Sequence, residues 1–179
     1  VGLVSGACFS EVGYEVICVD KDEDQVELIN QGQSPFYEEG LEEILHRQIG
    51  NRLKASTNLP QAIEQTDVTF IAVGTPYNGE EIDLRQIEEA SRSIGEALQN
   101  KTNHHLIVVK STVVPGTTEN VVVKLIEKYS RKQVGESISV SMNPEFLREG
   151  DAVQDFMSPD RIVIGCSDEK GRKILRSLY

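Results

Sequence analysis

Residues 106–118 have the sequence LIVVKSTVVPGTT, in which a β-branched run passes directly into a turn containing glycine. Two further stretches have the same character: residues 68–76 are VTFIAVGTP, and residues 138–150 are ISVSMNPEFLREG. Each short apolar run is typical of a buried strand. The carboxyl ends of parallel strands meet at one edge of a sheet, where open α/β sheets bind their ligands. The three junctions therefore predict a binding site at that edge.

Helical and strand-like patterns alternate along the whole chain of 179 residues. The predicted helices cover residues 2–12, 23–31, 41–49, 60–65, 84–98, 117–129 and 168–179. The predicted strands cover residues 15–19, 53–55, 68–73, 106–109, 138–142 and 161–164. This alternation is typical of βαβ units. We therefore expect a Rossmann-like, doubly wound α/β fold, with a mostly parallel sheet and helices on both of its faces.

The start of the chain departs from this pattern. A doubly wound domain begins with a strand, whereas this sequence begins with a helical pattern at Gly2. The first strand is central in the usual order 3-2-1-4-5-6, so without it the sheet has an open position in its middle. We expect the parent protein to carry roughly ten further residues before Val1, forming an apolar strand that ends in Gly-x-Gly.

Composition limits the class of ligand. Acidic residues outnumber basic ones by 29 to 18, and the resulting net charge of −11 argues against a nucleic-acid partner. A small anionic ligand stays open, because helix N-termini bind phosphate locally. The three cysteines show no metal-ligand spacing, and we expect no metal site. No apolar run reaches the about 20 residues of a membrane helix. We therefore expect a cytoplasmic protein without a membrane partner.

The first helix and the strand after it resemble half of a dinucleotide-binding fingerprint. Gly2 would be the last glycine of a G-x-G-x-x-G turn, with the pyrophosphate at the helix N-terminus. Asp20 ends the next strand 18 positions later, where an acid accepts hydrogen bonds from the ribose hydroxyls. A carboxylate there repels a 2′-phosphate, so NAD is favoured over NADP. Gly74, Thr75 and Pro76 form a turn that lets backbone approach such a ligand.

Taken together, these segments resemble the nucleotide-sugar 6-dehydrogenases, the group that includes the UDP-glucose and GDP-mannose enzymes. The matching segments span nearly the whole chain in the family's order: residues 1–4, 19–20, 34–41, 73–76, 110–112, 115–118 and 143–150. The most specific of them is NPEFLREG at residues 143–150. The resemblance implies that residues 1–179 are an N-terminal NAD-binding domain, cropped at both ends.

The resemblance implies a four-electron oxidation of a sugar C6 alcohol to a carboxylate, through a thioester, with two NAD reduced per sugar. Thr112 looks like the hydroxyl that positions the catalytic water, and Glu145 like the carboxylate that assists its attack. Glu149 looks like the residue against the nicotinamide and the sugar. The loop of Phe146, Leu147 and Arg148 looks like the one that holds the sugar diphosphate, largely through backbone groups. The NAD contacts would come from Gly2, Asp20, Gly74, Thr75, Pro76, Thr112 and Glu149.

Two physical conditions accompany these roles. Glu145 and Glu149 are four positions apart, so they share a face only if their loop is helical. Two close carboxylates near an anion should also have raised pKa values, which suits base chemistry near neutrality.

The chain departs from the family in two respects. Gln25 stands where many relatives have a basic residue. None of Cys8, Cys18 and Cys166 matches the family's nucleophile motif. We expect the catalytic cysteine and lysine, and a helix that forms a homodimer, to lie beyond Tyr179. The chain by itself is then expected to bind NAD without turnover.

The sequence leaves the substrate open. Residues 158–165, SPDRIVIG, resemble the UDP-glucose branch, whereas residues 125–141 are closer to the GDP-mannose branch. UDP-glucose is favoured, with GDP-mannose or a UDP-N-acetylhexosamine as alternatives. Three other classes also fit parts of the pattern. They are a 3-hydroxyacid or 6-phosphogluconate type of dehydrogenase, a non-catalytic NAD-sensing module, and a methyltransferase, whose sheet usually ends in an antiparallel hairpin that the pattern does not predict.

Overall fold

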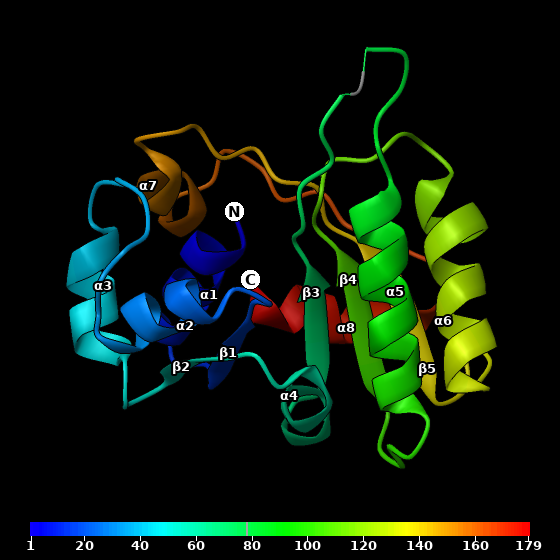
Figure 1. Ribbon diagram of the computed structural model, residues 1–179. Coiled ribbons are helices and arrows are strands. Elements are labelled where there is room, and N and C mark those ends of the chain that lie inside the picture. Colours follow the sequence, from blue (N-terminus) through cyan, green and yellow to red (C-terminus); the bar gives the residue numbers. More distant parts are fainter. Residues whose placement is uncertain (78) are drawn as a thin grey trace. The chain divides into compact units, whose positions relative to one another are not determined.

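The computed structural model describes residues 1–77 and 79–179, which divide into two compact units (Figure 1). The first unit consists of residues 1–58 and 146–161, and the second of residues 59–145 and 162–179. Each unit combines helices with parallel strands, and their strands form two separate hydrogen-bonded sheets. The protein therefore has the predicted mixed α/β fold, with mostly parallel strands. The strand expected ahead of Val1 stays a prediction.

The first unit contains a two-stranded sheet. Strand β1 (Val16–Val19) runs parallel to β2 (Leu53–Ser56), with Val16 opposite Leu53. Its helices are α1 (Gly2–Glu11), α2 (Glu23–Asn30), α3 (Leu41–Gln48) and α7 (Ala152–Met157).

Two features tie the helices of this unit together. Helix α1 packs so closely on β1 that a Cβ at Gly6 would lie 2.6 Å from the sulfur of Cys18. The ring of Phe9 in α1 meets that of Phe156 in α7 edge to face, with centroids 4.9 Å apart. Helix α7, though distant in sequence, is therefore anchored on the first helix of the chain.

The second unit is built on a four-stranded sheet in the order β3-β4-β5-β6. Strands β3 (Val68–Ile71), β4 (His105–Val109) and β5 (Ile138–Met142) are parallel, and β6 (Gly165–Cys166) pairs antiparallel with β5. Its helices are α4 (Leu59–Gln65), α5 (Arg85–Leu98), the π-helical turn η1 (Thr118–Val123), α6 (Lys124–Ser130) and α8 (Glu169–Leu178).

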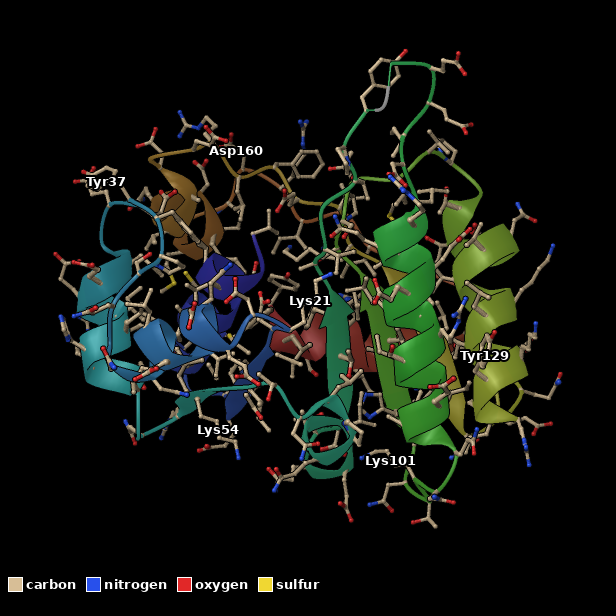
Figure 2. All side chains as sticks on the ribbon, in the orientation of Figure 1. Lys21, Tyr37, Lys54, Lys101, Tyr129 and Asp160 are labelled. Carbon is tan, nitrogen blue, oxygen red and sulfur yellow. The ribbon has the colours of Figure 1, made fainter. Side chains whose placement is uncertain are left out.

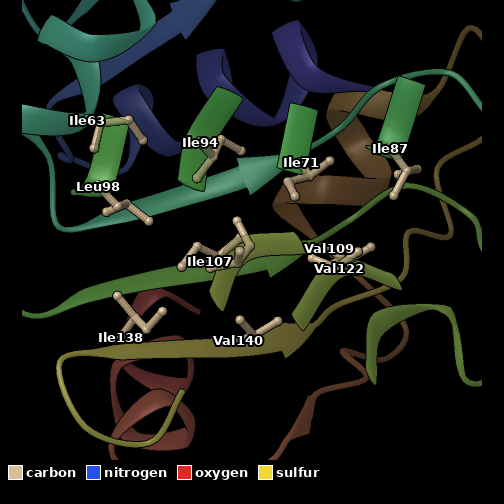
Figure 3. Packing of buried hydrophobic residues seen from close by; sticks show 11 residues of the cluster. Ile63, Ile71, Ile87, Ile94, Leu98, Ile107, Val109, Val122, Ile138 and Val140 are labelled. Atoms are coloured by element: carbon tan, nitrogen blue, oxygen red, sulfur yellow. The ribbon is translucent and has the colours of Figure 1, made fainter. Parts of the chain in front are cut away.

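Helices cover both faces of this sheet, as the sequence predicted. Ile107 and Val109 of β4 point to one face, where they pack among side chains of α5 and α6 (Figure 3). Leu106 and Val108 point to the other face and pack with Leu175 of α8. Every residue of β4 is buried, because neighbouring strands and helices surround it on all sides.

Two of the predicted elements are wrong in detail. Residues 161–164 form no strand; the strand in this region is β6, at Gly165–Cys166. Ile162 and Val163 are exposed, and the carbonyl of Val163 accepts a hydrogen bond from the side chain of Asn143 in place of a neighbouring strand. Strand β3 ends at Ile71, two residues earlier than predicted. The carbonyl of Val73 accepts a hydrogen bond from the hydroxyl of Ser111 and not from a neighbouring strand.

Two helical features were not predicted. The single helix expected over residues 117–129 begins as the π-helical turn η1, which contains the β-branched run of residues 121–123. Such residues lose rotamer freedom in an α-helix, which lowers their propensity to form one. Helix α7 was also missed, since residues 151–157 lie in what the sequence predicted to be a loop.

The only lysine between α5 and β4, Lys101, fastens the end of α4. Its ammonium group donates to the carbonyl oxygens of Ile63, Glu64 and Thr66, at 2.8, 3.2 and 2.7 Å (Figure 2). A cation at a helix C-terminus satisfies carbonyl groups that have no helical partner. Among residues 1–77 and 79–179, no helix combines the length and apolar character needed to cross a bilayer.

His105, the first residue of β4, gives the second unit a titratable core. Its ring is fully buried, and Nε2 lies 2.8 Å from the hydroxyl of Thr69. Burial, reinforced by the positive charge of Lys101, lowers the pKa of His105 from 6.5 to about 3. The folded protein therefore keeps this imidazole neutral well into the acid range.

We predict that His105 makes the free energy of unfolding fall as the pH drops from 6.5 towards 3. In that window the unfolded chain binds a proton that the folded protein excludes, at a cost of about 1.4 kcal/mol per pH unit. Urea unfolding of the wild type and of His105→Gln at several pH values measures the difference. The variant should show a shallower acid slope, and His46→Gln, at an exposed histidine, should not. Equal slopes for His105→Gln and the wild type would contradict the assignment.

Candidate functional site

The first two predicted junctions are joined by hydroxyl groups at the carboxyl edge of the four-stranded sheet. Ser111, two residues beyond β4, donates from Oγ to the carbonyl of Val73 at 2.7 Å. Thr75 donates from Oγ1 to the carbonyl of Thr112, also at 2.7 Å. These bonds hold the turn after β3 against the turn after β4. Gly74, Thr75, Pro76 and Thr112 are thus gathered at one edge, as predicted.

A buried cation lies at the same edge. Lys110 directly follows β4 and is only 4% exposed. Its ammonium group is 3.2 Å from Oδ1 of Asn143, the residue after β5, and 3.5 Å from the hydroxyl of Tyr179. The Tyr179 hydroxyl also donates to Oδ1 of Asn143 at 2.7 Å, and the Asn143 amide donates to the carbonyl of Val163 at 2.9 Å. The Asn143 side chain therefore forms hydrogen bonds with Lys110, with Tyr179 and with a backbone carbonyl.

Glu145 follows this network by two residues and is half-buried. Burial raises the pKa of its carboxyl group, while the positive charge of Lys110 acts in the opposite direction. Oxygen Oε2 is buried and accepts no hydrogen bond from the described residues. A carboxylate with a raised pKa and an unused acceptor oxygen is suited to take a proton near neutral pH.

The turn after β4 also has an unusual backbone. Gly116 has φ of +89°, in the region that side chains rarely adopt. A Cβ there would lie 3.1 Å from the side-chain nitrogen of Asn120. Glycine at this position allows the backbone to turn from the sheet edge into η1, where a side chain would be strained and would crowd Asn120.

In the first unit, two predicted NAD contacts occupy suitable local positions. Helix α1 begins at Gly2, and no side chain caps its first turn. Its amide groups can therefore bind an anion, because a helix N-terminus carries a partial positive charge. Asp20 is exposed directly after β1, and its Oδ1 accepts a hydrogen bond from the amide of Asp22 at 3.0 Å. That bond orients the carboxylate and leaves Oδ2 for a hydroxyl ligand.

The loop of residues 146–150 also belongs to the first unit, and its side chains are held in place. The guanidinium of Arg161 lies over the ring of Phe146, 4.7 Å from its centroid. Arg148 makes a bidentate ion pair with Asp155 of α7, at 3.1 Å from Nε and 2.7 Å from Nη2. Its backbone amide donates to the same carboxylate at 2.9 Å. The Arg148 side chain is thus held by Asp155 within the first unit.

The condition for pairing the two glutamates is not met. Residues 143–148 form no helix, and Glu149 lies in the turn that precedes α7, so the two carboxylates do not share a helical face. The pKa of Glu145 is raised, but its main cause is burial and not the neighbouring carboxylate of Glu149 that the sequence suggested.

Sequence reasoning missed three residues that shape these regions. Lys110 and Asn143 were noticed only as parts of longer motifs, and Glu38 received no role. Glu38 is buried, and its carboxylate accepts hydrogen bonds from the amides of Gly150 and Ala152. The signal for Lys110 was its position at the end of an apolar run. Glu38 gave no local signal, because its partners are more than 110 residues away.

Two other features of the described residues contribute no site. No group of three or more His, Cys, Asp or Glu side chains in the described part of the chain could hold a metal ion. A hollow of about 440 Å³ lies over residues 34–43 of the first unit. Glu38, Glu39, Glu42 and Glu43 are among its lining residues. Their negative charge disfavours a phosphate-bearing ligand there.

We predict that Asn143→Ala destabilises the protein by at least about 3 kcal/mol. The change removes a hydrogen bond to the charged Lys110 ammonium group, worth about 1.5–3 kcal/mol, and two between neutral groups, to Tyr179 and Val163, worth about 1 kcal/mol each. Tyr179→Phe removes the two hydrogen bonds of this hydroxyl, to Asn143 and from Lys110, and should cost about 1–2 kcal/mol. Urea denaturation measures both, with Asn103→Ala as a control at an exposed asparagine. An Asn143→Ala protein as stable as the control variant would rule out the network as a support of this edge.

Comparison with known proteins agrees with the geometry. The NAD-binding domain of the UDP-glucose/GDP-mannose dehydrogenase family matches residues 1–179. The UDP-glucose 6-dehydrogenase AglM of Haloferax volcanii is 46% identical over 180 residues, and these cover 100% of this chain and 42% of that protein. The GDP-mannose 6-dehydrogenase of Pseudomonas aeruginosa is 46% identical over 183 residues, again covering 100% of this chain and 42% of that protein. The chain thus spans about two fifths of the length of these relatives.

Solved structures give the same result. A ternary complex of the Pseudomonas aeruginosa GDP-mannose dehydrogenase has a TM-score of 0.98 at 44% identity, covering 100% of this chain and 42% of that one. A UDP-glucose dehydrogenase from Pyrobaculum islandicum has a TM-score of 0.93 at 43% identity, covering 99% of this chain and 41% of that one. The chain belongs to the UDP-glucose/GDP-mannose dehydrogenase family and corresponds to its NAD-binding domain.

Proposed function

We propose that this chain is the NAD-binding half of a nucleotide-sugar 6-dehydrogenase that converts UDP-glucose to UDP-glucuronate. The balanced reaction takes the C6 alcohol, one water and two NAD⁺ to the carboxylate, two NADH and three protons. The observation that carries the proposal is the half-buried Glu145, whose pKa is raised by burial, next to the sheet edge where the Thr75 hydroxyl donates to the backbone carbonyl of Thr112. A reaction that must activate water needs such a base.

The residues of the chain fit NAD. The first-turn amides of α1, starting at Gly2, would bind the pyrophosphate, and Asp20 would accept hydrogen bonds from the adenosine ribose. The turns of residues 74–76 and 110–113 would line the nicotinamide side. NAD supplies the hydride acceptor when it is bound. A strand ahead of Val1, ending in Gly-x-Gly, would complete the pyrophosphate site.

The chain's own contribution to the chemistry is to hold water and to move its proton. The Thr112 hydroxyl would position a water molecule, and Glu145 would take the proton of that water as it attacks the thioester carbonyl. Glu149 and the backbone of residues 146–148 would hold the sugar and its diphosphate. Under this proposal the cysteine that forms the thioester, the active-site lysine and the helix of a homodimer all lie in the part of the protein after residue 179.

GDP-mannose is the second candidate substrate. The observation in its favour is that a relative named for GDP-mannose, that of Pseudomonas aeruginosa, matches this chain at 46% identity, the same value as the UDP-glucose 6-dehydrogenase AglM. UDP-N-acetylhexosamines are less favoured, because the structures named for UDP-N-acetylmannosamine are 25–26% identical.

The amount of NADH formed per sugar tests the proposal. The full-length protein is supplied with limiting UDP-glucose, GDP-mannose or a UDP-N-acetylhexosamine, and with NAD or NADP. We expect two NADH per UDP-glucose, and little reaction with NADP because Asp20 repels its 2′-phosphate. One NADH per sugar would remove the water step and the roles of Thr112 and Glu145. NAD binding without any turnover would favour a sensing module instead.

We predict that Glu145→Gln lowers kcat of the full-length protein about 100-fold or more, since a positioned base contributes about 10²–10⁴-fold. NAD affinity should change little, because the amide keeps the shape of the side chain. Glu119→Gln, at an exposed glutamate of the same unit, serves as the control and should keep wild-type kcat. A Glu145→Gln enzyme with near wild-type kcat would exclude Glu145 as the base.

A further inference from the structure

Glu38 makes a contact that its sequence neighbours do not share. It lies in the loop between α2 and α3, flanked by Tyr37, which is 86% exposed and points outward in Figure 2, and by the exposed Glu39. Glu38 itself is 9% exposed. Its Oε2 accepts a hydrogen bond from the amide of Gly150 at 3.1 Å, and its Oε1 accepts one from the amide of Ala152 at 2.7 Å. Both carboxylate oxygens therefore bind the segment that leads into α7.

This contact replaces the local cap of α7. The residue at the cap position, Asp151, makes no capping hydrogen bond with its side chain and instead lies 3.6 Å from the guanidinium of Arg148. The first amide of the helix, that of Ala152, is bound by Glu38. A carboxylate at a helix N-terminus is stabilised both by the free amides and by the helix dipole. The N-terminus of helix α7 is therefore capped by Glu38, which lies far from the helix in the sequence.

The same carboxylate fixes the end of the loop of residues 146–150. Gly150 has φ of +86°, and Glu38 binds its amide in this turn. Arg148 is fastened to Asp155 of α7 through its backbone amide and its guanidinium group. A shift of α7 or of Gly150 would therefore carry the backbone of the loop with it.

We infer that Glu38 is a positioning residue for the nucleotide sugar: by binding the amides of Gly150 and Ala152 it sets the place of the backbone groups at residues 146–149. This inference rests on the proposed function, since that function assigns those groups to the sugar diphosphate. Displacing such groups by about 1 Å costs on the order of 100-fold in rate. Glu38 itself does not touch the substrate; it acts through the loop of residues 146–150.

Glu38→Gln tests the inference in the full-length protein. The amide keeps one acceptor oxygen but turns an NH₂ group towards a backbone N–H, so one of the two hydrogen bonds is lost. We expect KM for the nucleotide sugar to rise by roughly 10- to 100-fold, while KM for NAD stays unchanged. Glu38→Asp keeps both acceptors on a shorter side chain and should restore part of the sugar affinity. Glu39→Gln, the same change at the exposed neighbour, should behave as wild type.

Hydrogen exchange by mass spectrometry gives a readout that does not depend on turnover. Peptides covering residues 146–153 should exchange faster in Glu38→Gln, whereas peptides from β3 to β5 should not change. Suppose that the wild type oxidises the sugar normally. If Glu38→Gln then has the same sugar KM and the same hydrogen exchange as Glu39→Gln, the inference is overturned and the proposed function still stands. Faster exchange and a lower melting temperature with unchanged sugar KM would make Glu38 a purely structural cap, and would also overturn it. A wild type that oxidises no nucleotide sugar would overturn the proposed function and, with it, this role.

Discussion

The complete burial of β4 is the constraint on which the second unit depends. Alternate side chains of His105–Val109 supply the cores on both faces of the sheet, so the strand cannot move without disturbing both layers. Its register with β3 and β5 is fixed over nearly its whole length. Whatever follows β4 is therefore held firmly, and Lys110, Ser111 and Thr112 follow it directly. Burial of β4 by itself therefore makes the carboxyl edge of the four-stranded sheet rigid.

That edge is organised by buried polar contacts. Ser111 and Thr75 link the turns after β3 and β4, and the Lys110–Asn143–Tyr179 network links the end of β4 to the end of β5. The Lys110 ammonium group is buried and is hydrogen-bonded to Asn143, two residues before Glu145. Its positive charge limits how far burial can raise the pKa of the Glu145 carboxyl group. The network thus has both a mechanical and an electrostatic effect on the proposed base.

The sequence was sufficient for features that depend on local patterns. Apolar runs such as residues 106–109 predicted the parallel strands, and the turns after them predicted the edge at which Thr75 and Thr112 lie. Features that depend on contacts between residues distant in the sequence were not predicted. Helix α7 has no cap of its own because Glu38 supplies it, and the strand predicted at residues 161–164 is absent because Asn143 binds the carbonyl of Val163. Periodicity cannot reveal a hydrogen bond between residues 20 or 114 positions apart.

We propose that this chain holds NAD and the water-activating base of a sugar oxidation. A crystal structure of the full-length protein with NAD and the unreacted nucleotide sugar tests it most directly. We expect the adenosine ribose at Asp20, the nicotinamide at the turns of residues 74–76 and 110–113, and the Glu145 carboxylate within one water molecule of the sugar C6 atom. A dinucleotide bound away from these turns, or a C6 atom that Glu145 cannot reach through one water, would contradict it.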